Sequence, residues 1–289
     1  MEIRRITWVT VLAVLTGVLL VFSHLSTDNV DFSQYNTGWN GTSRFFDQAS
    51  GALLIQEPGA LVGYRNATLL VIAPAGNYTP EETLVYRDFL AQGNRIVLFD
   101  DFGTGDQLLS GVGSAIRLPG TALASADQAF ENASLVRVYP EGNSSLVRNI
   151  SGLTLNGPGS VEGGTPFLSS SLFTWEDANG DFRLDRNETL GRFTVGASEQ
   201  RGGGELVVIG DPSILINGMA GVDPGNERFI SGLLGSASTT LIDMTHSRTS
   251  GNGSMGGIIH MIQTTTLIQT IVLIAIAVAV AATFRRKDH

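Results

Sequence analysis

Cysteine is absent from this chain of 289 residues, and lysine occurs once, at Lys287. The lack of cysteine excludes disulfides, thiolate metal ligands and cysteine nucleophiles together. Charged residues make up 16% of the chain and the formal net charge is −9, so no lysine-built basic patch is present to face a phosphate backbone. We therefore expect no nucleic-acid partner.

Histidine is also scarce, and the four histidines lie within or beside the apolar chain ends: His24, His246, His260 and His289. The stretch from about Asn29 to Met244 contains none. A Ser-His-Asp triad, an HExxH zinc site and an imidazole general base are therefore not expected in the main domain. Catalysis there would depend on carboxylates, tyrosines, arginines or a hard metal, so a non-enzymatic domain is favoured over an enzyme.

The first apolar run, residues 6–25, carries no charge and is long enough to cross ~30 Å of hydrocarbon as a helix. Arg4 and Arg5 precede it, so the positive-inside rule places the N-terminus in the cytoplasm. The alternative is a cleaved signal peptide. The run is longer than the apolar part of most signal peptides and lacks an A-x-A ending, which favours an anchor.

The second apolar run, residues 264–284, is followed at once by three cationic residues, Arg285, Arg286 and Lys287. We expect a second transmembrane helix with its C-terminal end inside. The prediction is a two-pass protein of the cell membrane, in contact with the lipid bilayer, with cytoplasmic tails at 1–5 and 285–289. Linkers at 26–35 and 245–263 would then flank an extracytoplasmic domain at 36–244.

The spacing of asparagine, serine and threonine supports an exported domain. Eight N-x-S/T sequons occur between the two apolar runs, at Asn40, Asn66, Asn77, Asn132, Asn143, Asn149, Asn187 and Asn252. An N-glycosylated outer surface explains this number. Chance reuse of residues that favour loops is the alternative.

The first half of the domain contains a strand–helix–strand pattern. The apolar run Thr68–Ala73 and the run "RIVLFDD", which begins at Arg95, are typical of buried strands. Between them Thr79 can cap a helix, Pro80 suits its first position and Gly93 can end it. This spacing predicts a right-handed βαβ unit with a parallel sheet. We expect the buried side of the helix to consist of Leu84, Tyr86, Phe89 and Leu90.

The second half of the domain is less regular. Leu206–Ile209 is a third buried strand, "NERFISGLLG" a helix and "TTLIDMT" a last strand. These elements predict an open, mostly parallel α/β sheet. Between about Gly111 and Glu199 the chain is rich in Gly, Ser and Asn, which indicates long loops and short strands or a small subdomain.

Four stretches of the chain form a recognisable set: "YNTGWNGTSRFF", "TPEETLVYRDFLAQGNRIVLFDDFGTGDQLL", "WEDANGDFRLDRNETLGRFTVGA" and "GGGELVVIGDPSILIN". Together they resemble domain-of-unknown-function family 4350, which is found mainly in archaeal and some bacterial membrane-anchored proteins. The resemblance covers most of residues 36–235. It implies a class I glutamine-amidotransferase-like or flavodoxin-like sheet and a role in a cell-surface complex with other membrane proteins. It carries over no catalytic residues, and active amidotransferases need a cysteine and a histidine.

Acidic side chains follow two of the expected strands. Asp100 and Asp101 end one strand, and Asp211 ends another, with Asn217 six residues further on. In open α/β sheets ligands bind beyond the carboxyl ends of the strands, so we expect these four residues to bind a ligand. The alternative is that the carboxylates only cap the turns and helices that follow.

The stretch "DANGDFRLDRNE" spaces its polar residues like a calcium loop. Candidate ligands fall at positions one, three, five, nine and twelve of such a loop: Asp177, Asn179, Asp181, Asp185 and Glu188. Phe182 stands where an EF-hand requires glycine, and the flanking residues favour strands over helices. A calcium loop of another type and a plain acidic turn both stay open, and no other cofactor is expected.

The favoured function is a non-enzymatic, membrane-anchored extracytoplasmic domain that binds a partner protein or ligand as an accessory subunit of a surface complex. A carboxylate- or metal-dependent hydrolase acting on envelope glycans is one alternative. A structural envelope glycoprotein is the other.

Overall fold

The computed structural model describes residue 17 and residues 29–127, 132–236 and 238–250. Asp31–Ser250 form one compact unit, which we call the domain. Apart from Gly17, the two predicted membrane spans lie outside the described residues. Within the described part of the chain, no helix is long and apolar enough to cross a membrane.

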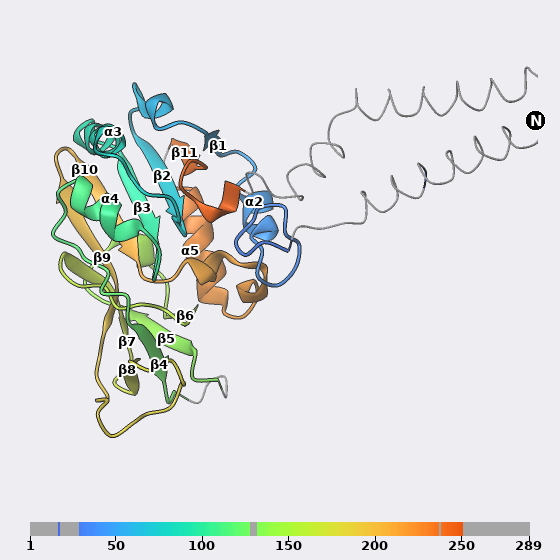
Figure 1. Ribbon diagram of the computed structural model, residues 1–289, viewed down its shortest axis with the longest axis vertical. Coiled ribbons are helices and arrows are strands. Elements are labelled where there is room, and N and C mark those ends of the chain that lie inside the picture. Colours follow the sequence, from blue (N-terminus) through green and yellow to red (C-terminus); the bar gives the residue numbers. More distant parts are fainter. Residues whose placement is uncertain (1–16, 18–28, 128–131, 237, 251–289) are drawn as a thin grey trace, which may run out of the picture. The chain divides into compact units, whose positions relative to one another are not determined.

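The domain is built on a mixed sheet of nine strands in the order β1-β11-β2-β3-β10-β9-β7-β5-β6 (Figure 1). Its strands are β1 (Leu53–Ile55), β2 (Ala67–Ile72), β3 (Arg95–Phe99), β5 (Leu135–Pro140), β6 (Leu153–Asn156), β7 (Thr165–Ser170), β9 (Thr194–Arg201), β10 (Gly204–Ile209) and β11 (Thr239–Asp243). A second sheet pairs β4 (Ala122–Ser125) with β8 (Thr174–Asp177).

Helices connect and cover the strands. The α-helices are α2 (Ser43–Gln48), α3 (Pro80–Ala91), α4 (Gly105–Gly111) and α5 (Pro224–Leu234). The 3-10 helices are η1 (Pro58–Leu61), η2 (Ser145–Val147), η3 (Pro212–Leu215), η4 (Asn217–Met219) and η5 (Arg248–Ser250).

The fold is α/β as expected, but its sheet is not mostly parallel. Strands β1, β11, β2, β3 and β10 run parallel, whereas β9, β7, β5 and β6 each pair antiparallel. With β4–β8, five of the nine pairings are antiparallel. The direction changes at a tight hairpin: Gly202 and Gly203 alone join β9 to β10, and Gly202 has a φ of +61°, which glycine adopts without strain.

The predicted βαβ unit is confirmed as β2–α3–β3. Thr79 and Glu82 form a reciprocal capping box, in which the Thr79 hydroxyl accepts the Glu82 N–H at 3.2 Å and the Glu82 carboxylate accepts the Thr79 N–H at 2.8 Å. Gly93 follows the helix with a φ of +86°. The expected buried position of Leu84 is wrong, because the helix turns Thr83, with Tyr86, Phe89 and Leu90, to the core.

Two apolar layers lie on opposite faces of the sheet, because successive strand residues point to opposite sides. In β2, Leu70 and Ile72 belong to the layer that includes residues of α5. Leu69 and Val71 belong to the other layer, with residues of α3 and α4. Helices on both faces explain why these strands are apolar throughout.

The segment after β11 is part of the domain rather than a linker. His246, Ser247 and Thr249 are buried. The His246 carbonyl accepts the Ala75 N–H at 2.9 Å, and the Ser247 hydroxyl accepts the Ile72 N–H at 3.1 Å. The chain therefore crosses the carboxyl end of β2 before it leaves the domain. The expectation of a domain without histidine, ending at residue 244, is wrong for this reason.

Candidate functional site

Asp100 caps the start of α4 at the carboxyl end of β3. Its two carboxylate oxygens accept the N–H groups of Gly103 at 3.0 Å and Gly105 at 2.7 Å. Burial raises the pKa of Asp100 to about 6, and the charge of Asp101 adds to the rise. Asp101 itself accepts the Phe102 N–H at 2.7 Å, and burial raises its pKa as well. Both side chains thus shape the β3–α4 turn.

Asp211 lies completely buried at the end of the neighbouring strand β10. Its carboxylate accepts the Ser213 N–H at 2.7 Å, and so begins η3. The other oxygen accepts the Asn156 N–H at 2.8 Å, on the edge strand β6. Burial raises the pKa of Asp211 to about 8, and the charge of Asp101 contributes. Asp211 therefore closes part of an otherwise open sheet edge.

Asn217 holds the N-terminal segment of the domain. Its amide nitrogen donates to the carbonyls of Asn36 at 3.0 Å and Gly38 at 2.7 Å, and its oxygen accepts the Arg44 N–H at 2.9 Å. The three aspartates interact electrostatically at one edge of the sheet, whereas the hydrogen bonds of Asn217 go to a different segment. The side chains of these four residues already form hydrogen bonds with backbone groups. A ligand role for them stays a prediction.

The acidic loop is a set of turns organised by Asp177, which is buried at the end of β8. One oxygen accepts the N–H groups of Gly180 at 3.0 Å and Asp181 at 3.2 Å, and the other accepts the Phe182 N–H at 2.9 Å. Phe182 has a φ of +57°, in the left-handed region that large side chains avoid. The bonds to Asp177 hold it there.

The remaining predicted calcium ligands also bond within the loop. Glu188 accepts the N–H groups of Ala178 at 3.0 Å and Asp185 at 2.9 Å, and the Asn179 amide donates to Asp185 at 3.0 Å. The loop follows a strand, so the helix that opens an EF-hand is absent from this described segment. No group of three His, Cys, Asp or Glu side chains suited to a metal ion occurs among the described residues. Calcium binding by this loop stays a prediction.

The sequence did not predict a buried cluster of polar side chains around His246. The Tyr86 hydroxyl donates to Asp243 at 3.1 Å and lies 3.3 Å from Nδ1 of His246. Nε2 of His246 lies 3.5 Å from Glu82. Burial, reinforced by the charge of Asp243, raises the pKa of Tyr78 and Tyr86 and keeps both rings neutral. The signal for this cluster in the sequence is Asp243, which ends a buried strand, with His246 three residues later.

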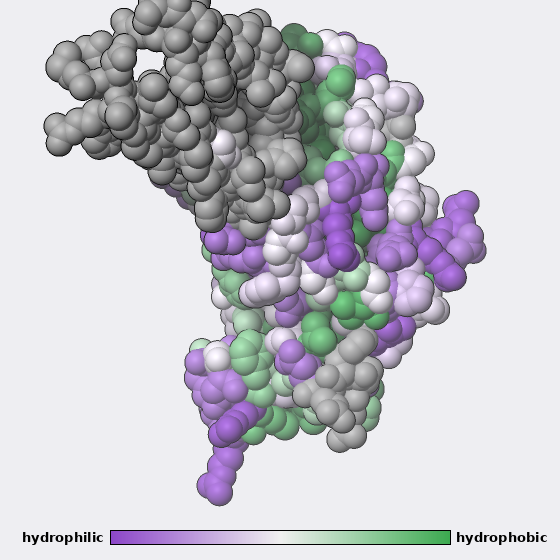
Figure 2. Space-filling view, turned by 90° about the vertical axis from the view of Figure 1, so that its right-hand side faces the viewer, coloured by the Kyte–Doolittle hydropathy of each residue, from purple (hydrophilic) through white to green (hydrophobic). Residues whose placement is uncertain are grey.

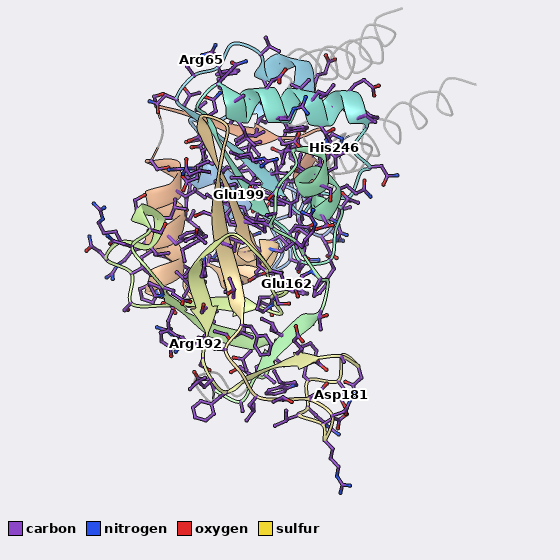
Figure 3. All side chains as sticks on the ribbon, turned by 90° about the vertical axis from the view of Figure 1, so that its left-hand side faces the viewer. Arg65, Glu162, Asp181, Arg192, Glu199 and His246 are labelled. Atoms are coloured by element: carbon purple, nitrogen blue, oxygen red, sulfur yellow. The ribbon has the colours of Figure 1, made fainter. Side chains whose placement is uncertain are left out.

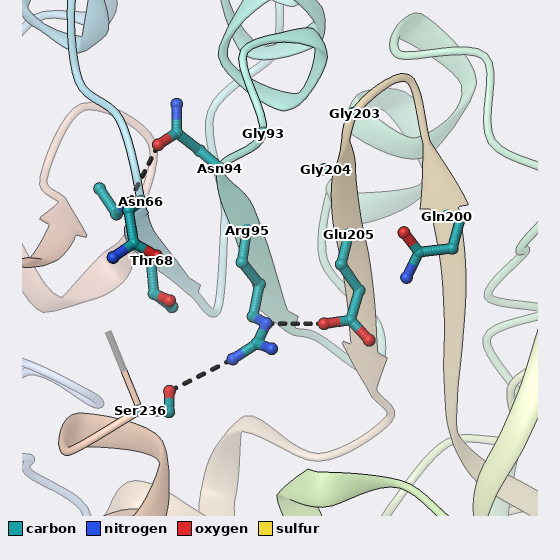
Figure 4. Close-up of a pocket in the computed structure, with 11 residues that line it drawn as sticks. Asn66, Thr68, Gly93, Asn94, Arg95, Gln200, Gly203, Gly204, Glu205 and Ser236 are labelled. Carbon is teal, nitrogen blue, oxygen red and sulfur yellow. Dashed lines mark hydrogen bonds and ion pairs between the residues drawn. The ribbon is translucent and has the colours of Figure 1, made fainter. Parts of the chain in front are cut away.

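A polar cavity of about 230 Å3 lies at the opposite edge of the sheet, where β2, β3 and β10 begin (Figure 4). Arg95 and Glu205 face each other across β3 and β10, with 2.7 Å between Nε and the carboxylate. Arg95 also donates to the Ser236 hydroxyl at 3.2 Å. The cavity is smaller than the ~300–1,000 Å3 of ordinary ligand pockets, and its charges are already paired.

Strands β4 and β8 and the loop that contains Asp181 form a lobe at the lower end of the domain, away from His246 (Figures 1 and 3). We call it the β4–β8 lobe and define it as residues 122–125 and 171–193. Five large apolar side chains are exposed on it: Leu172, Phe173, Phe182, Leu184 and Leu190. Figure 2 shows apolar residues among hydrophilic ones at this end.

Comparisons with known proteins give one family. A family model described as Domain of unknown function (DUF4350) matches residues 34–234. No curated protein matches the chain. The solved structures that match have low sequence identities and low TM-scores. The mmIFT52 N-terminal domain has 18% identity and a TM-score of 0.42, over 60% of this chain and 77% of that one.

Two further solved structures are more distant. A β-galactosidase from Bacillus circulans sp. alkalophilus has 11% identity and a TM-score of 0.31, over 54% of this chain and 22% of that one. A cytoplasmic protein from Salmonella typhimurium LT2 has 11% identity and a TM-score of 0.30, over 57% and 67%. At these scores the likeness carries no argument about function.

Proposed function

The chain belongs to the DUF4350 family of domains of unknown function, and on that premise we propose that it binds a partner protein through the β4–β8 lobe. In this proposal the domain is extracytoplasmic, is anchored by membrane helices at 6–25 and 264–284, and acts without catalysis as an accessory subunit of a surface complex. The uncharged runs, their flanking arginines and the sequons support the location.

The conformation of Phe182 carries the proposal. A large side chain in the left-handed region costs roughly 1–2 kcal/mol relative to glycine. The loop nevertheless uses phenylalanine there and leaves it 44% exposed. The three N–H bonds to Asp177 fix the turn, so the backbone at Phe182 and the direction of its Cα–Cβ bond are fixed. An exposed aromatic side chain on a fixed backbone suits the role of an anchor in a protein interface.

The neighbouring turn supports the same role. Leu172 is 63% exposed and Phe173 is 61% exposed, between β7 and β8. Groups of exposed apolar side chains on a small lobe mark interaction surfaces. The predicted catalytic alternative has less support, because the carboxylates of Asp100 and Asp211 already accept backbone N–H groups on both oxygens.

Site-specific photo-cross-linking in native membranes tests the proposal. A benzophenone amino acid is placed at position 172 of the full-length protein, and at position 62 as a matched control. Val62 is 72% exposed directly after η1, outside the lobe. We expect a discrete cross-linked product from position 172 and none of comparable yield from position 62. Equal yields, or none from the lobe, would overturn the proposal.

A further inference from the structure

We infer that Trp39 enters the lipid–water interface of the membrane to which the chain is anchored, so that the surface around it contacts the bilayer. The inference rests on the anchored placement in the proposed function, but not on the partner of the β4–β8 lobe. Three observations carry it: the exposure of Trp39, the fixed backbone around it, and the place at which the chain enters and leaves the domain.

Trp39 is exposed to an extent that is unusual for tryptophan. Its exposed fraction is 72%, whereas that of Trp175, the other tryptophan of the domain, is 3%. Tryptophan is highly buried on average in folded proteins, because its ring system is large and mostly apolar. The same ring with its one N–H donor suits a boundary between an apolar and a wet environment, and tryptophan is enriched at membrane interfaces. The exposure of Trp39 therefore points to a surface that covers it.

The backbone at Trp39 is held in place by hydrogen bonds to the body of the domain. The Asn217 amide donates to the carbonyl of Gly38 at 2.7 Å. The Trp39 carbonyl itself accepts an N–H of η4, also at 2.7 Å. The turn therefore needs no ordering when it meets a surface, which lowers the entropic cost of the contact.

The turn lies beside the points at which the chain enters and leaves the domain. The Phe32 N–H donates to the Asn40 carbonyl at 2.8 Å, which brings Trp39 next to the first residues of the domain. The Gln34 N–H donates to the Thr249 carbonyl at 3.1 Å, so the last residues of the domain lie there as well. Both proposed spans are therefore tethered to one place on the domain.

The tether between the first proposed span and the domain is short. Five residues, 26–30, separate Leu25 from Asp31, so these two residues are at most about 22 Å apart even in a fully extended chain. A domain of this size is roughly 40 Å across, and the interfacial layer on each side of the hydrocarbon is about 5–8 Å thick. With this anchor in the bilayer, the surface around Asp31 faces the membrane, and Trp39 lies on that surface.

Charge does not select the lipid in this contact. The segments that meet here expose both signs, Asp31 and Asp47 against Arg44 and Arg248. Anionic membranes are recognised by clusters of about four to eight basic residues, so the contact of Trp39 does not depend on anionic lipid. A protein is the alternative partner of this side chain. The short tether favours the bilayer, because it keeps a lipid interface within reach at all times.

Fluorescence quenching by brominated phosphatidylcholine tests the inference on the full-length protein in vesicles of this lipid. The bromine is placed either near the headgroup end or near the methyl end of the acyl chains. The variant W8F keeps Trp39 and Trp175, whereas W8F/W39F keeps Trp175 alone. We expect bromine near the headgroup to remove most of the emission that Trp39 contributes, and bromine near the methyl end to remove less. Because Trp39 is exposed, both variants should have the same melting temperature.

The variant F173W in the W8F/W39F background is the matched control. Phe173 is 61% exposed on the β4–β8 lobe, which lies away from His246 (Figure 3). An indole at this position is an exposed aromatic ring on another part of the same domain, and we expect bromine to leave it unquenched. Quenching of F173W as strong as that of Trp39 would mean that the domain has no preferred membrane surface, and would overturn the inference.

Trp8 separates the inference from the anchored placement, because this residue belongs to the proposed span 6–25. If that span is in the bilayer, bromine quenches W39F more than W8F/W39F. Quenching of Trp8 without quenching of Trp39 overturns the inference, leaves the anchored placement standing and assigns Trp39 to a protein partner. Quenching of neither overturns both. The partner of the lobe is tested separately, by the cross-link from position 172.

Discussion

The imidazole of His246 lies against the ring of Tyr78, with 4.0 Å between the ring centroids and 21° between the planes. The same imidazole sits between two carboxylates, 3.5 Å from Glu82 and 3.7 Å from Asp243. Glu82 belongs to α3 and Asp243 ends β11. These contacts join the segment after β11 to α3.

His246 should give the domain a pH-dependent stability. Burial lowers the pKa of His246, but the bonding and charge of Asp243 and Glu82 outweigh it, and the net pKa is raised. A raised folded pKa means that the stabilisation is complete below the unfolded value of ~6.5 and is lost as pH rises through the folded value. We therefore expect the imidazolium to contribute more at pH 6 than at pH 8.

The replacement H246F keeps an aromatic ring against Tyr78 and removes the charge, so it isolates this contribution. Urea unfolding of wild type and H246F should differ more at pH 6 than at pH 8. Tyr86 also faces the imidazole, and its raised pKa keeps it neutral over this range. A difference that is the same at both pH values would contradict the assignment of the charge to His246.

Asp211 should produce a second pH dependence of the same sign. Its pKa of about 8 lies above the unfolded value of ~3.9, so its contribution is complete below ~3.9 and is lost as pH rises towards 8. D211N cannot ionise. We expect the unfolding free energy of D211N, relative to wild type, to rise between pH 5 and pH 9, as measured by urea titration. D88N on the exposed side of α3 is the control. A relative value independent of pH would mean that Asp211 stays ionised.

The parallel half of the sheet could be predicted because its signals are local. Thr79, Pro80 and Gly93 mark the ends of α3, and the flanking strands are apolar throughout because helices cover both faces. The antiparallel half could not. Strand β9, "TVGASEQR", and strand β7, "TPFLSS", contain small and polar residues that also suit loops. Their pairing depends on long-range contacts that no local pattern encodes.

The candidate residues illustrate the same limit. Asp100 and Asp211 were expected at the carboxyl edge of the sheet because strand ends can be read from sequence, and both lie there. Their hydrogen-bond partners include Asn156, which is 55 residues away from Asp211 in the chain. Sequence spacing shows where a carboxylate is available but not whether the backbone already uses it. His246 was misplaced because the burial of His246, Ser247 and Thr249 follows from tertiary packing.

The acidic loop should depend on Asp177 and not on calcium. Replacing Asp177 with alanine leaves the N–H groups of Gly180 and Phe182 without their acceptor, while the Asp181 N–H keeps its bond to Asn179, and the loss should cost about 1–3 kcal/mol. D181A removes a carboxylate with one such bond and serves as the control. We expect a clear fall in melting temperature for D177A and a small one for D181A, with no change between EDTA and millimolar calcium. Stabilisation of wild type by calcium, abolished in D177A, would instead establish a metal loop.

Sequon occupancy should follow exposure of both the asparagine and the hydroxyl residue. The pairs Asn77–Thr79, Asn143–Ser145, Asn149–Ser151 and Asn187–Thr189 are exposed. At Asn40 the amide donates to Asp31 and accepts from Asn36, and Thr42 is buried. Glycopeptide mass spectrometry of protein from native membranes should find sugar at Asn77, Asn143 and Asn149 and none at Asn40. Sugar at Asn40, or none at the three exposed sites, would contradict the extracytoplasmic placement or the domain structure.

Asn187 is the informative exception, because it lies in the β4–β8 lobe that we propose binds a partner protein. A sugar there would occupy the space that the partner needs, since N-linked glycans are bulky and hydrophilic. We therefore expect the cross-linked product from position 172 to be unglycosylated at Asn187, and the protein that is not cross-linked to carry any sugar that is attached. N187Q should raise the yield of the cross-linked product, whereas N143Q should not. Equal occupancy of Asn187 in both fractions would argue against binding through this loop.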